Sequence, residues 1–383
     1  SLAESLGMSL PGCAAIPAPY RERSQMAYDT GYRSVNLVLE DIKPSNIMTM
    51  DAFQNAIVTA SAIGASTNAP PHIIAIAKQL DLNLNLDHWE KWGEKIPLLV
   101  NLQPAGEYLG EGYFNAGGVP AVMKELLDNN KLVSKALTVS GKTVKENLIN
   151  VNCKDRKVIY SYSEPLKENA GFLVLRSNFF DTAIMKMSVV SKEFKERYLS
   201  DEKKPMEFNV RAIVFDGPEH YHNEINNPEL KIDENCILMI RGCGPIGYPG
   251  AAEVVNMQPP DYLLKKGITS LPCLGDGRQS GTSESPSILN VSPEAAAGGG
   301  LAIIKNNDLI KVDLNNKRVD LILDDLEIKS RFNEIKFDYP SNQTPWQELA
   351  REYTGQLGEG ACLDLKEKYI NVAESKGIPR DNH

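Results

Sequence analysis

Residues 236–253 read CILMIRGCGPIGYPGAAE, an apolar run that leads directly into a glycine-rich loop. The run at 236–240 predicts a buried strand. The loop spells G-x-G-x-x-G, which after a strand is the fingerprint of a dinucleotide-binding fold. Two prolines argue against that interpretation, because Pro245 removes a backbone N–H from the phosphate loop and Pro249 adds a second rigid point. We interpret the glycines as places where backbone approaches a ligand closely, and expect them to place Glu253 at the start of a helix.

The sequence on both sides of this stretch contains many short β-rich runs separated by turn residues. The turns at 306–308 and 315–316 are asparagine-rich and typical of hairpins. The pattern contains no parallel βαβ unit that could carry a dinucleotide. Short strands at this spacing predict a β-barrel-like or sandwich domain with flanking helices. The runs lie at residues 157–162, 172–175, 211–215, 236–240 and 301–304.

The first 130 residues have a different pattern and predict mainly helices. One helical pattern stops at Gly64, and the cap residues and prolines that follow open another helix at 72–80. A short apolar run at 96–102 predicts a buried strand. We therefore expect an N-terminal α/β domain, residues 1–130, and a C-terminal β-barrel-like domain, residues 131–383, with a helical tail.

Composition limits the classes of partner. With 383 residues the chain is too long for one compact core. Its formal net charge of −9 argues against nucleic acid and anionic membranes as partners. No apolar run is long enough to span a bilayer, and no signal-peptide pattern is visible. Six scattered cysteines without a CxxC pair favour a reducing cytoplasm. We expect a cytoplasmic protein that acts on a small molecule.

A second polar loop, GDGRQSGTSESPS at 275–287, lies between two apolar runs. Taken alone, it would be a solvated Gly/Ser turn, but its place between core segments suggests a site. His220 and His222 have the i, i+2 spacing of metal ligands on a strand. They lie in a polar stretch that predicts a loop, so we interpret them as surface residues.

Motifs spread over the whole chain resemble the dehydratases that comprise dihydroxy-acid dehydratase, phosphogluconate dehydratase and the sugar-acid (aldonate) dehydratases. The GYPGAAE and RQSGT forms are similar to the aldonate branch, which acts on pentonates or hexonates such as arabinonate or xylonate. The resemblance implies an N-terminal α/β domain that carries a metal cluster, a barrel-like second domain and a homo-oligomer, either dimer or tetramer. The motifs are LPGCAAIP at 10–17, GASTNA at 64–69, NLQPAG at 101–106, NAGGVP at 115–120, GPIGYPGAAEV at 244–254, GDGRQSGT at 275–282 and PRDNH at 379–383.

The resemblance also implies a reaction and its cofactors. The family removes water from a 2,3-dihydroxy acid and produces a 2-keto-3-deoxy acid. Because hydroxide is a poor leaving group from C3, the family uses a [2Fe-2S] cluster with an open iron as a Lewis acid. A nearby Mg²⁺ coordinates the substrate carboxylate. Cys13 matches a thiolate ligand of the cluster, and Glu253 matches a carboxylate ligand of the magnesium.

Four further residues match substrate-handling positions of the family. Ser280 matches the base that removes the C2 proton. Because a serine hydroxyl is a very weak base, it needs positive charge nearby, which Arg278 can supply. The match also implies that Thr282 hydrogen-bonds a substrate oxygen and that the imidazole of His383 reaches the substrate.

The chain departs from the family in its ligand count. One thiolate cannot hold a cluster that needs three, and the family's other ligands lie upstream, so we expect an N-terminally truncated chain. Glu284 and Cys243 replace small residues that are usual in the branch. Three alternatives stay open: a catalytically incomplete fragment that acts as a binding or dimerising module, a dihydroxy-acid dehydratase of branched-chain amino-acid synthesis, and a dinucleotide-binding protein.

Overall fold

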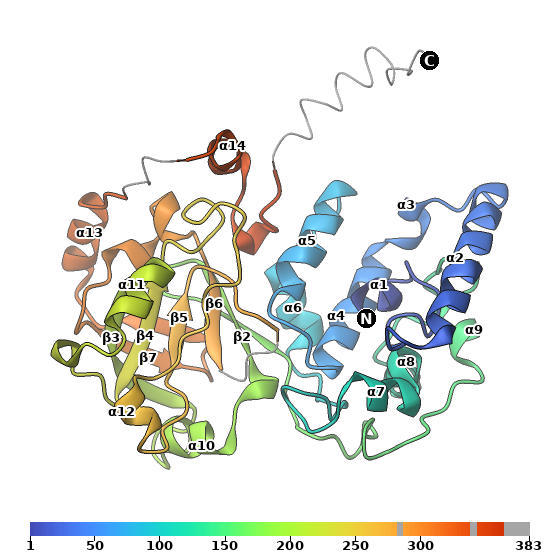
Figure 1. Ribbon diagram of the computed structural model, residues 1–383, viewed down its shortest axis with the longest axis horizontal. Coiled ribbons are helices and arrows are strands. Elements are labelled where there is room, and N and C mark those ends of the chain that lie inside the picture. Colours follow the sequence, from blue (N-terminus) through green and yellow to red (C-terminus); the bar gives the residue numbers. More distant parts are fainter. Residues whose placement is uncertain (282–285, 338–342, 364–383) are drawn as a thin grey trace.

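A computed structural model describes residues 1–281, 286–337 and 343–363 of the chain. Figure 1 shows two parts that lie side by side, helices from the first half of the chain and a strand-rich part from the second half. In the described residues, no helix combines the length and the apolar character that a membrane span requires.

Helices dominate the first part, as the sequence predicts. Gly64 has a φ of +64° beyond the end of one helix, and the next begins at Ala69 with Pro70 and Pro71 in its first turn. In the described structure, the run predicted as a strand at 96–102 makes only isolated bridges, from Leu98 to Lys167, from Val100 to Ile159 and from Leu102 to Tyr108. The helices are α1 (Leu2–Ser5), α2 (Arg21–Leu39), α3 (Pro44–Ile47), α4 (Met50–Ala62), α5 (Ala69–Gln79), α6 (Leu86–Gly93), α7 (Gly110–Ala116), α8 (Gly118–Asp128) and α9 (Val144–Leu148).

The second part is built on one eight-stranded sheet with the order β1-β2-β6-β5-β4-β3-β7-β8. Backbone hydrogen bonds of Arg176 to Lys317 and Val319, each 2.9 Å, connect its two edges. The sheet is therefore a nearly closed barrel, which confirms the barrel-like architecture. The strands are β1 (Phe172–Leu175), β2 (Thr182–Lys186), β3 (Glu207–Asp216), β4 (Cys236–Arg241), β5 (Cys273–Gly275), β6 (Ser287–Ser292), β7 (Leu309–Asp313) and β8 (Arg318–Leu321).

The middle of this sheet is parallel, which corrects one expectation. Strands β3, β4, β5 and β6 pair in parallel, and α11 (Gly217–Glu224) connects β3 to β4 as a βαβ unit. The sequence does not indicate this helix, because the helix buries only Pro218 and Tyr221 in the described structure. Two buried residues are too few to produce a helical repeat of apolar positions. His220 and His222 thus lie on a helix and not in the predicted loop, and His222 is exposed.

At three short segments the observed structure can be compared with the sequence prediction. The strand expected at 301–304 is wrong, because Gly300–Ile303 forms a 3₁₀ turn. Residues 157–162 form isolated bridges, not a strand. The asparagine turn at 315–316 does connect an antiparallel hairpin, β7 to β8. The second part also carries α10 (Lys192–Phe194), α12 (Asp261–Leu264), α13 (Asp325–Asn333) and α14 (Pro345–Tyr353).

The two parts pack directly against each other. Alternate residues of the strands, such as Met185 and Ile288, fill the barrel interior. On the outer face of β1 and β2, Phe172, Val174 and Ile184 join an apolar cluster with α4, α5 and α6. The cluster around α8 continues to Ile159. A domain boundary at residue 130 stays a prediction.

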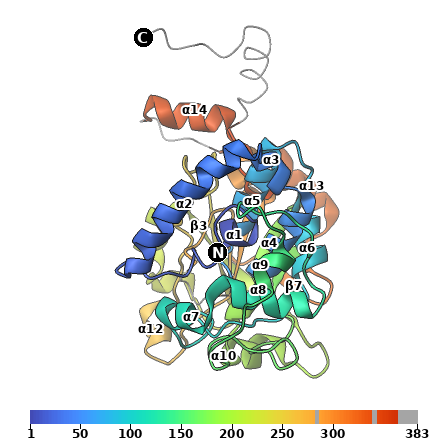
Figure 2. The same cartoon turned by 90° about the vertical axis from the view of Figure 1, so that its right-hand side faces the viewer.

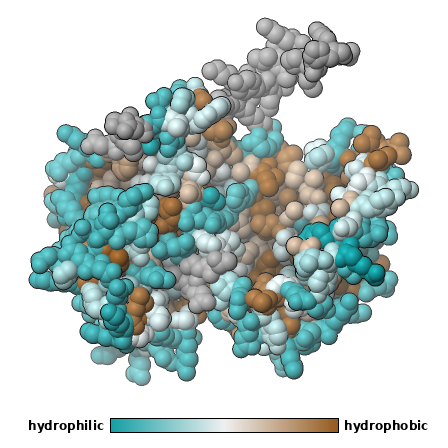
Figure 3. Space-filling model, in the orientation of Figure 1, coloured by the Kyte–Doolittle hydropathy of each residue, from teal (hydrophilic) through white to brown (hydrophobic). Residues whose placement is uncertain are grey.

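Helix α2 lies at the far edge of the helical part. In Figure 2, which looks onto that side, α2 lies across the surface. It has no buried residue. Five large apolar side chains on it are 60–79% exposed, and Figure 3 shows apolar surface on the helical side of the molecule. They are Tyr28, Tyr32, Val35, Val38 and Leu39.

Candidate active site

Three segments that are distant in sequence meet where the helical part contacts the barrel. They are the loop after β5, the glycine loop after β4, and the connection between α4 and α5. The side-chain amide of Asn68 donates to the carboxylate of Glu253 and to the carbonyl of Gln279, the latter at 3.1 Å. The Oδ1 atom of Asn68 accepts from Arg278 at 3.5 Å. Asn68, which is 8% exposed, therefore connects the three segments.

The backbone on both sides of Ser280 is held in place. Gln279 is 4% exposed, and its Nε2 atom donates to Oγ of Ser287 at 3.1 Å. A Cβ on Gly281 would approach the side chain of Ser66 to 2.8 Å, so only glycine fits this close contact. Ser280 itself is half-buried. Its hydroxyl therefore lies on a loop that the helical part and the barrel fix from opposite sides.

Arg278 is oriented by its own loop neighbourhood. Its Nε atom donates to the carbonyl of Ala251 at 2.7 Å, and its backbone carbonyl accepts from Val255 at 3.0 Å. In the part of the chain that the structure describes, Nη2 makes no hydrogen bond. The guanidinium thus keeps a donor for an anionic ligand.

Glu253 does not begin a helix, contrary to expectation. The next helix begins at Asp261, because the positive φ angles of Gly250 (+93°) and Ala251 (+45°) turn the chain away from helical geometry. The side chain of Glu253 is exposed and its carboxylate is held by Asn68. A side-chain amide, not a helix N-terminus, therefore holds this carboxylate.

The amides of the glycine loop are already bonded within the protein. The carboxylate of Asp276, which is fully buried, accepts the N–H groups of Gly242 and Cys243 at 2.9 Å. Glu294, 1% exposed, accepts those of Ile246 and Gly247 at 2.9 and 2.8 Å. Burial raises the pKa of both carboxyl groups, against the backbone N–H groups that stabilise their charged forms. These amides are not available to a pyrophosphate, which removes the main support for a dinucleotide site.

Sequence reasoning missed several residues of this arrangement. The sequence indicates only a helix cap at Asn68, inside the GASTNA motif, and no role for Asp276 or Glu294. Their signal is an acidic residue inside an apolar, glycine-flanked segment, where a carboxylate needs buried donors. Thr282, Glu284 and His383 lie outside the described residues.

Cys13 lies on the loop between α1 and α2. It is half-buried and free, and none of its hydrogen bonds reaches Glu253 or the Ser280 loop. Three other cysteines, Cys236, Cys243 and Cys273, are buried. Burial raises the pKa of the Cys236 thiol to about 11, and burial together with Asp276 raises that of Cys243 further. The raised pKa values make Cys236 and Cys243 poor candidates for a thiolate ligand.

The residues present match the family's metals in kind but not in number. A thiol suits an iron–sulfur cluster and a carboxylate oxygen suits Mg²⁺. Among the residues that the structure describes, no three or more His, Cys, Asp or Glu side chains gather to hold a metal ion. The described chain therefore fits neither complete site, and no reaction step below depends on either metal.

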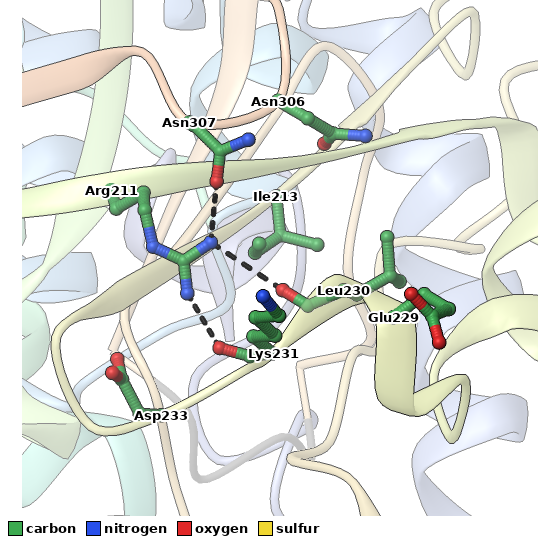
Figure 4. A pocket seen from close by; sticks show the side chains of 8 residues that line it. All are labelled: Arg211, Ile213, Glu229, Leu230, Lys231, Asp233, Asn306 and Asn307. Atoms are coloured by element: carbon green, nitrogen blue, oxygen red, sulfur yellow. Dashed lines mark hydrogen bonds between the residues drawn. The ribbon is translucent and has the colours of Figure 1, made fainter.

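A polar cavity of about 490 Å³ lies elsewhere on the barrel, where β4 begins beside β3 (Figure 4). Its guanidinium, Arg211, is committed to the carbonyls of Leu230 and Lys231 and to the side chain of Asn307. The Ser280 loop follows the carboxyl end of β5, the opposite end of the parallel strands, where ligands of α/β sheets usually bind. This cavity is therefore separate from the candidate site.

Comparison with known proteins defines the class. Residues 1–147 match the N-terminal domain described as dihydroxy-acid/6-phosphogluconate dehydratase, and residues 157–361 match the C-terminal domain of the same description. The chain belongs to the dihydroxy-acid/6-phosphogluconate dehydratase family, which confirms the resemblance.

Individual relatives narrow the branch. The chain is 55% identical over 383 residues to D-xylonate dehydratase of Caulobacter vibrioides, covering 100% of this chain and 64% of that protein. It is 40% identical over 382 residues to L-arabinonate dehydratase of Rhizobium leguminosarum bv. trifolii, covering 100% and 63%. It is 38% identical over 367 residues to dihydroxy-acid dehydratase of Acetivibrio thermocellus, covering 95% and 64%. The chain thus spans just under two-thirds of the length of these relatives, and the names of the first two support the aldonate branch.

Proposed function

We propose that this chain carries the serine-loop half of the active site of a sugar-acid dehydratase. The substrate is a pentonate such as D-xylonate or L-arabinonate, and the product is its 2-keto-3-deoxy acid. Membership of the family and the 55% identity to a D-xylonate dehydratase support the reaction class. The 38% identity to a dihydroxy-acid dehydratase gives less support to a branched-chain substrate.

One structural observation carries the proposal. Asn68 binds both Glu253 and the backbone of Gln279, and these partners are separated from it by 185 and 211 residues. A contact between three loops has no need of a serine, an arginine and a carboxylate for stability alone. Their convergence where the two parts meet is typical of a site assembled for a polar, anionic ligand.

The reaction begins at the C2 carbon of the sugar acid. The C2–H bond breaks and its proton passes to Oγ of Ser280, while the electron pair forms the C2–C3 double bond of an enol. The C3–O bond breaks, and the leaving hydroxide takes up one proton, equivalent to the one removed from C2, and departs as water; we assign no residue of this chain to that proton transfer. The enol then loses the proton of its C2 hydroxyl, takes one at C3 and becomes the 2-keto acid.

Positive charge near Ser280 is needed for this role, because a neutral hydroxyl is a poor base. Arg278, two residues away, is held by Ala251 and Asn68 with Nη2 directed to no protein partner in the described residues. We assign to it the stabilisation of the Ser280 oxyanion and of the substrate carboxylate. Thr282 and His383 stay predicted substrate contacts, Glu253 a predicted Mg²⁺ ligand and Cys13 a predicted cluster ligand.

The test uses the complete native protein that contains this chain, with 2-keto acid formation measured on D-xylonate, L-arabinonate and 2,3-dihydroxyisovalerate. We expect turnover of a pentonate that Ser280→Ala lowers by at least 1,000-fold. Ser270→Ala, at the opposite end of β5, serves as the matched control and should keep wild-type activity. Ser280→Ala activity within tenfold of wild type would remove Ser280 as the base. Turnover of 2,3-dihydroxyisovalerate alone would replace the substrate assignment, and no turnover at all would favour a binding or dimerising module.

We also propose a cytoplasmic homo-oligomer, dimer or tetramer, in line with the family and with the reducing environment that six free cysteines favour. Light scattering of the complete native protein measures the oligomer directly. A monomer at micromolar concentration would contradict it.

A further inference from the structure

Glu4 is a buried carboxylate beside the loop that carries Cys13. It lies on the first helix, α1, and is 6% exposed. One carboxylate oxygen, Oε1, accepts the backbone N–H of Gly12 at 2.6 Å. The other, Oε2, accepts the backbone N–H of Ala14 at 2.8 Å. The two amides on either side of Cys13 are therefore bound by the two oxygens of one side chain.

The opposite edge of the same loop is held by a cation. The guanidinium of Arg23, in the first turn of α2, donates to the carbonyl of Cys13 at 3.3 Å and to the carbonyl of Ile16. A Cβ on Gly118 would approach Ala15 to 3.0 Å, so α8 also packs closely on the loop. A carboxylate thus takes the N–H groups of the loop while a guanidinium supplies its carbonyls.

The loop has little internal structure of its own. The backbone N–H of Cys13 bonds to the carbonyl of Leu10 at 3.1 Å, which closes a single turn. Gly12 has a φ of +87°, a conformation that glycine adopts freely because it has no Cβ and that other residues rarely adopt. Burying a carboxylate is costly unless donors satisfy it, so the position of Glu4 depends on the loop as much as the loop depends on Glu4.

We propose that Glu4 is a positioning residue that holds the Cys13 thiol in one orientation by clamping the amides on both sides of it. The use of that thiol as an iron ligand rests on the proposed function. The clamp itself rests only on the contacts of Glu4, so the two can be tested separately. Sequence alone could not identify it, because Glu4 reads as an ordinary helix residue.

The first test needs no substitution. Hydrogen–deuterium exchange of the complete native protein, followed by mass spectrometry, reports the amides of residues 10–17. We expect the Gly12 and Ala14 amides to exchange at least 100-fold more slowly than unstructured amides. Exchange at the unprotected rate in the wild-type protein would overturn the clamp directly.

The second test measures the reactivity of the Cys13 thiol. Iron is removed under reducing conditions, and alkylation by iodoacetamide is followed at each cysteine by mass spectrometry. Glu4→Gln presents an N–H group where one loop amide needs an acceptor, so we expect alkylation of Cys13 to change by at least tenfold. Cys153 and Cys362, which are also half-buried, serve as internal references and should stay within twofold. Glu22→Gln, an exposed glutamate of α2, is the matched control and should change none of them.

A structural role for Glu4 gives a different result. If Glu4→Gln speeds all three cysteines equally, Glu4 supports the fold generally and the positioning role is wrong. Glu4→Asp keeps two acceptor oxygens. We therefore expect it to reverse at least half of the change in Cys13 alkylation rate that Glu4→Gln causes. Should Glu4→Gln not fold, Glu4→Asp and the exchange measurement still decide. If the exchange and alkylation tests contradict the role of Glu4 while activity still depends on Ser280, only this inference is refuted. If those tests support the role of Glu4 while activity does not depend on Ser280, only the proposed function is refuted.

Discussion

The side-chain amide of Asn68 donates a hydrogen bond to the carboxylate of Glu253, across 185 residues of sequence. Asn68 belongs to the helical part and Glu253 to the glycine loop of the barrel. Because the same amide also binds the carbonyl of Gln279, one residue of the helical part contacts both the glycine loop and the serine loop. A neutral amide holds the carboxylate without cancelling its charge, which leaves Glu253 able to bind a cation.

The first prediction tests that charge. Glu253→Gln keeps an oxygen that can accept from Asn68 but binds a hard cation poorly. We expect the Mg²⁺ concentration for half-maximal activity to rise at least tenfold, with the melting temperature unchanged within 2 °C. Magnesium titration of the complete native protein measures it, and Glu334→Gln, an exposed glutamate at the end of α13, is the control. An unchanged titration would remove Glu253 from the metal site.

The second prediction compares two cysteines. Cys13 is half-buried on a clamped loop, whereas Cys243 is buried beside Asp276, and burial raises the pKa of its thiol. A thiol that resists ionisation is a poor ligand for iron. We expect Cys13→Ser to lower the iron content of the complete native protein at least fivefold and Cys243→Ala to leave it within 20%. Iron analysis and the visible absorption spectrum decide, and the reverse order would exchange the two assignments.

Part of this fold could be predicted from local pattern alone. The apolar runs at 172–175, 211–215 and 236–240 are strands because each is short, β-rich and bounded by turn residues. The helix 217–224 was missed, since its buried face consists of a proline and a tyrosine in the described structure. Without that helix the short strands indicate a barrel or sandwich, but not the parallel pairing of β3, β4, β5 and β6 at its centre.

The site residues also divide into those that the sequence indicates and those that it does not. Ser280 and Arg278 stand out because hydroxyl, guanidinium and glycine between core runs have no packing use. Asn68, Asp276 and Glu294 do not stand out, because their roles arise from long-range contacts. Asp276 bonds amides of a loop more than thirty residues earlier. An acidic residue inside an apolar segment indicates that its carboxylate needs donors, but only the three-dimensional structure identifies which amides supply them.

The third prediction concerns those buried amides. Asp276→Ala leaves the N–H groups of Gly242, Cys243 and Ala295 without their acceptor. Each unsatisfied buried donor costs about 1–3 kcal/mol. We expect the free energy of unfolding to fall by about 3 kcal/mol or more, measured by denaturant titration. Asp325→Ala, an exposed aspartate of α13, should change it by less than about 0.5 kcal/mol. A small loss for Asp276→Ala would mean that the glycine loop does not depend on this carboxylate.

The fourth prediction concerns Lys186, which ends β2 and is 5% exposed. It shares the outer face of its strand with Ile184, so it points towards the helical part. In the residues that the structure describes, its ammonium has no hydrogen bond or ion pair, and the charged group that acts on it is Lys167. Burial first, and repulsion from Lys167 second, lower the pKa of Lys186 to about 8.

The sign of the pH effect follows from where protons bind. Between pH 8 and the unfolded value of 10.5, the unfolded chain holds a proton that the folded chain has lost, so stability rises with pH across this window. Below pH 8 both states are charged and the cost of burying the ammonium is fully present. At about 1.4 kcal/mol per pKa unit, this cost is at most about 3 kcal/mol. Lys186→Met removes it, so we expect the variant to be more stable than wild type at pH 7 and the gap to close towards pH 10. Denaturant titrations of both proteins at pH 7, 8.5 and 10 measure the gap, with the exposed Lys265→Met as control. A gap that does not change with pH would show that Lys186 keeps its charge throughout this range.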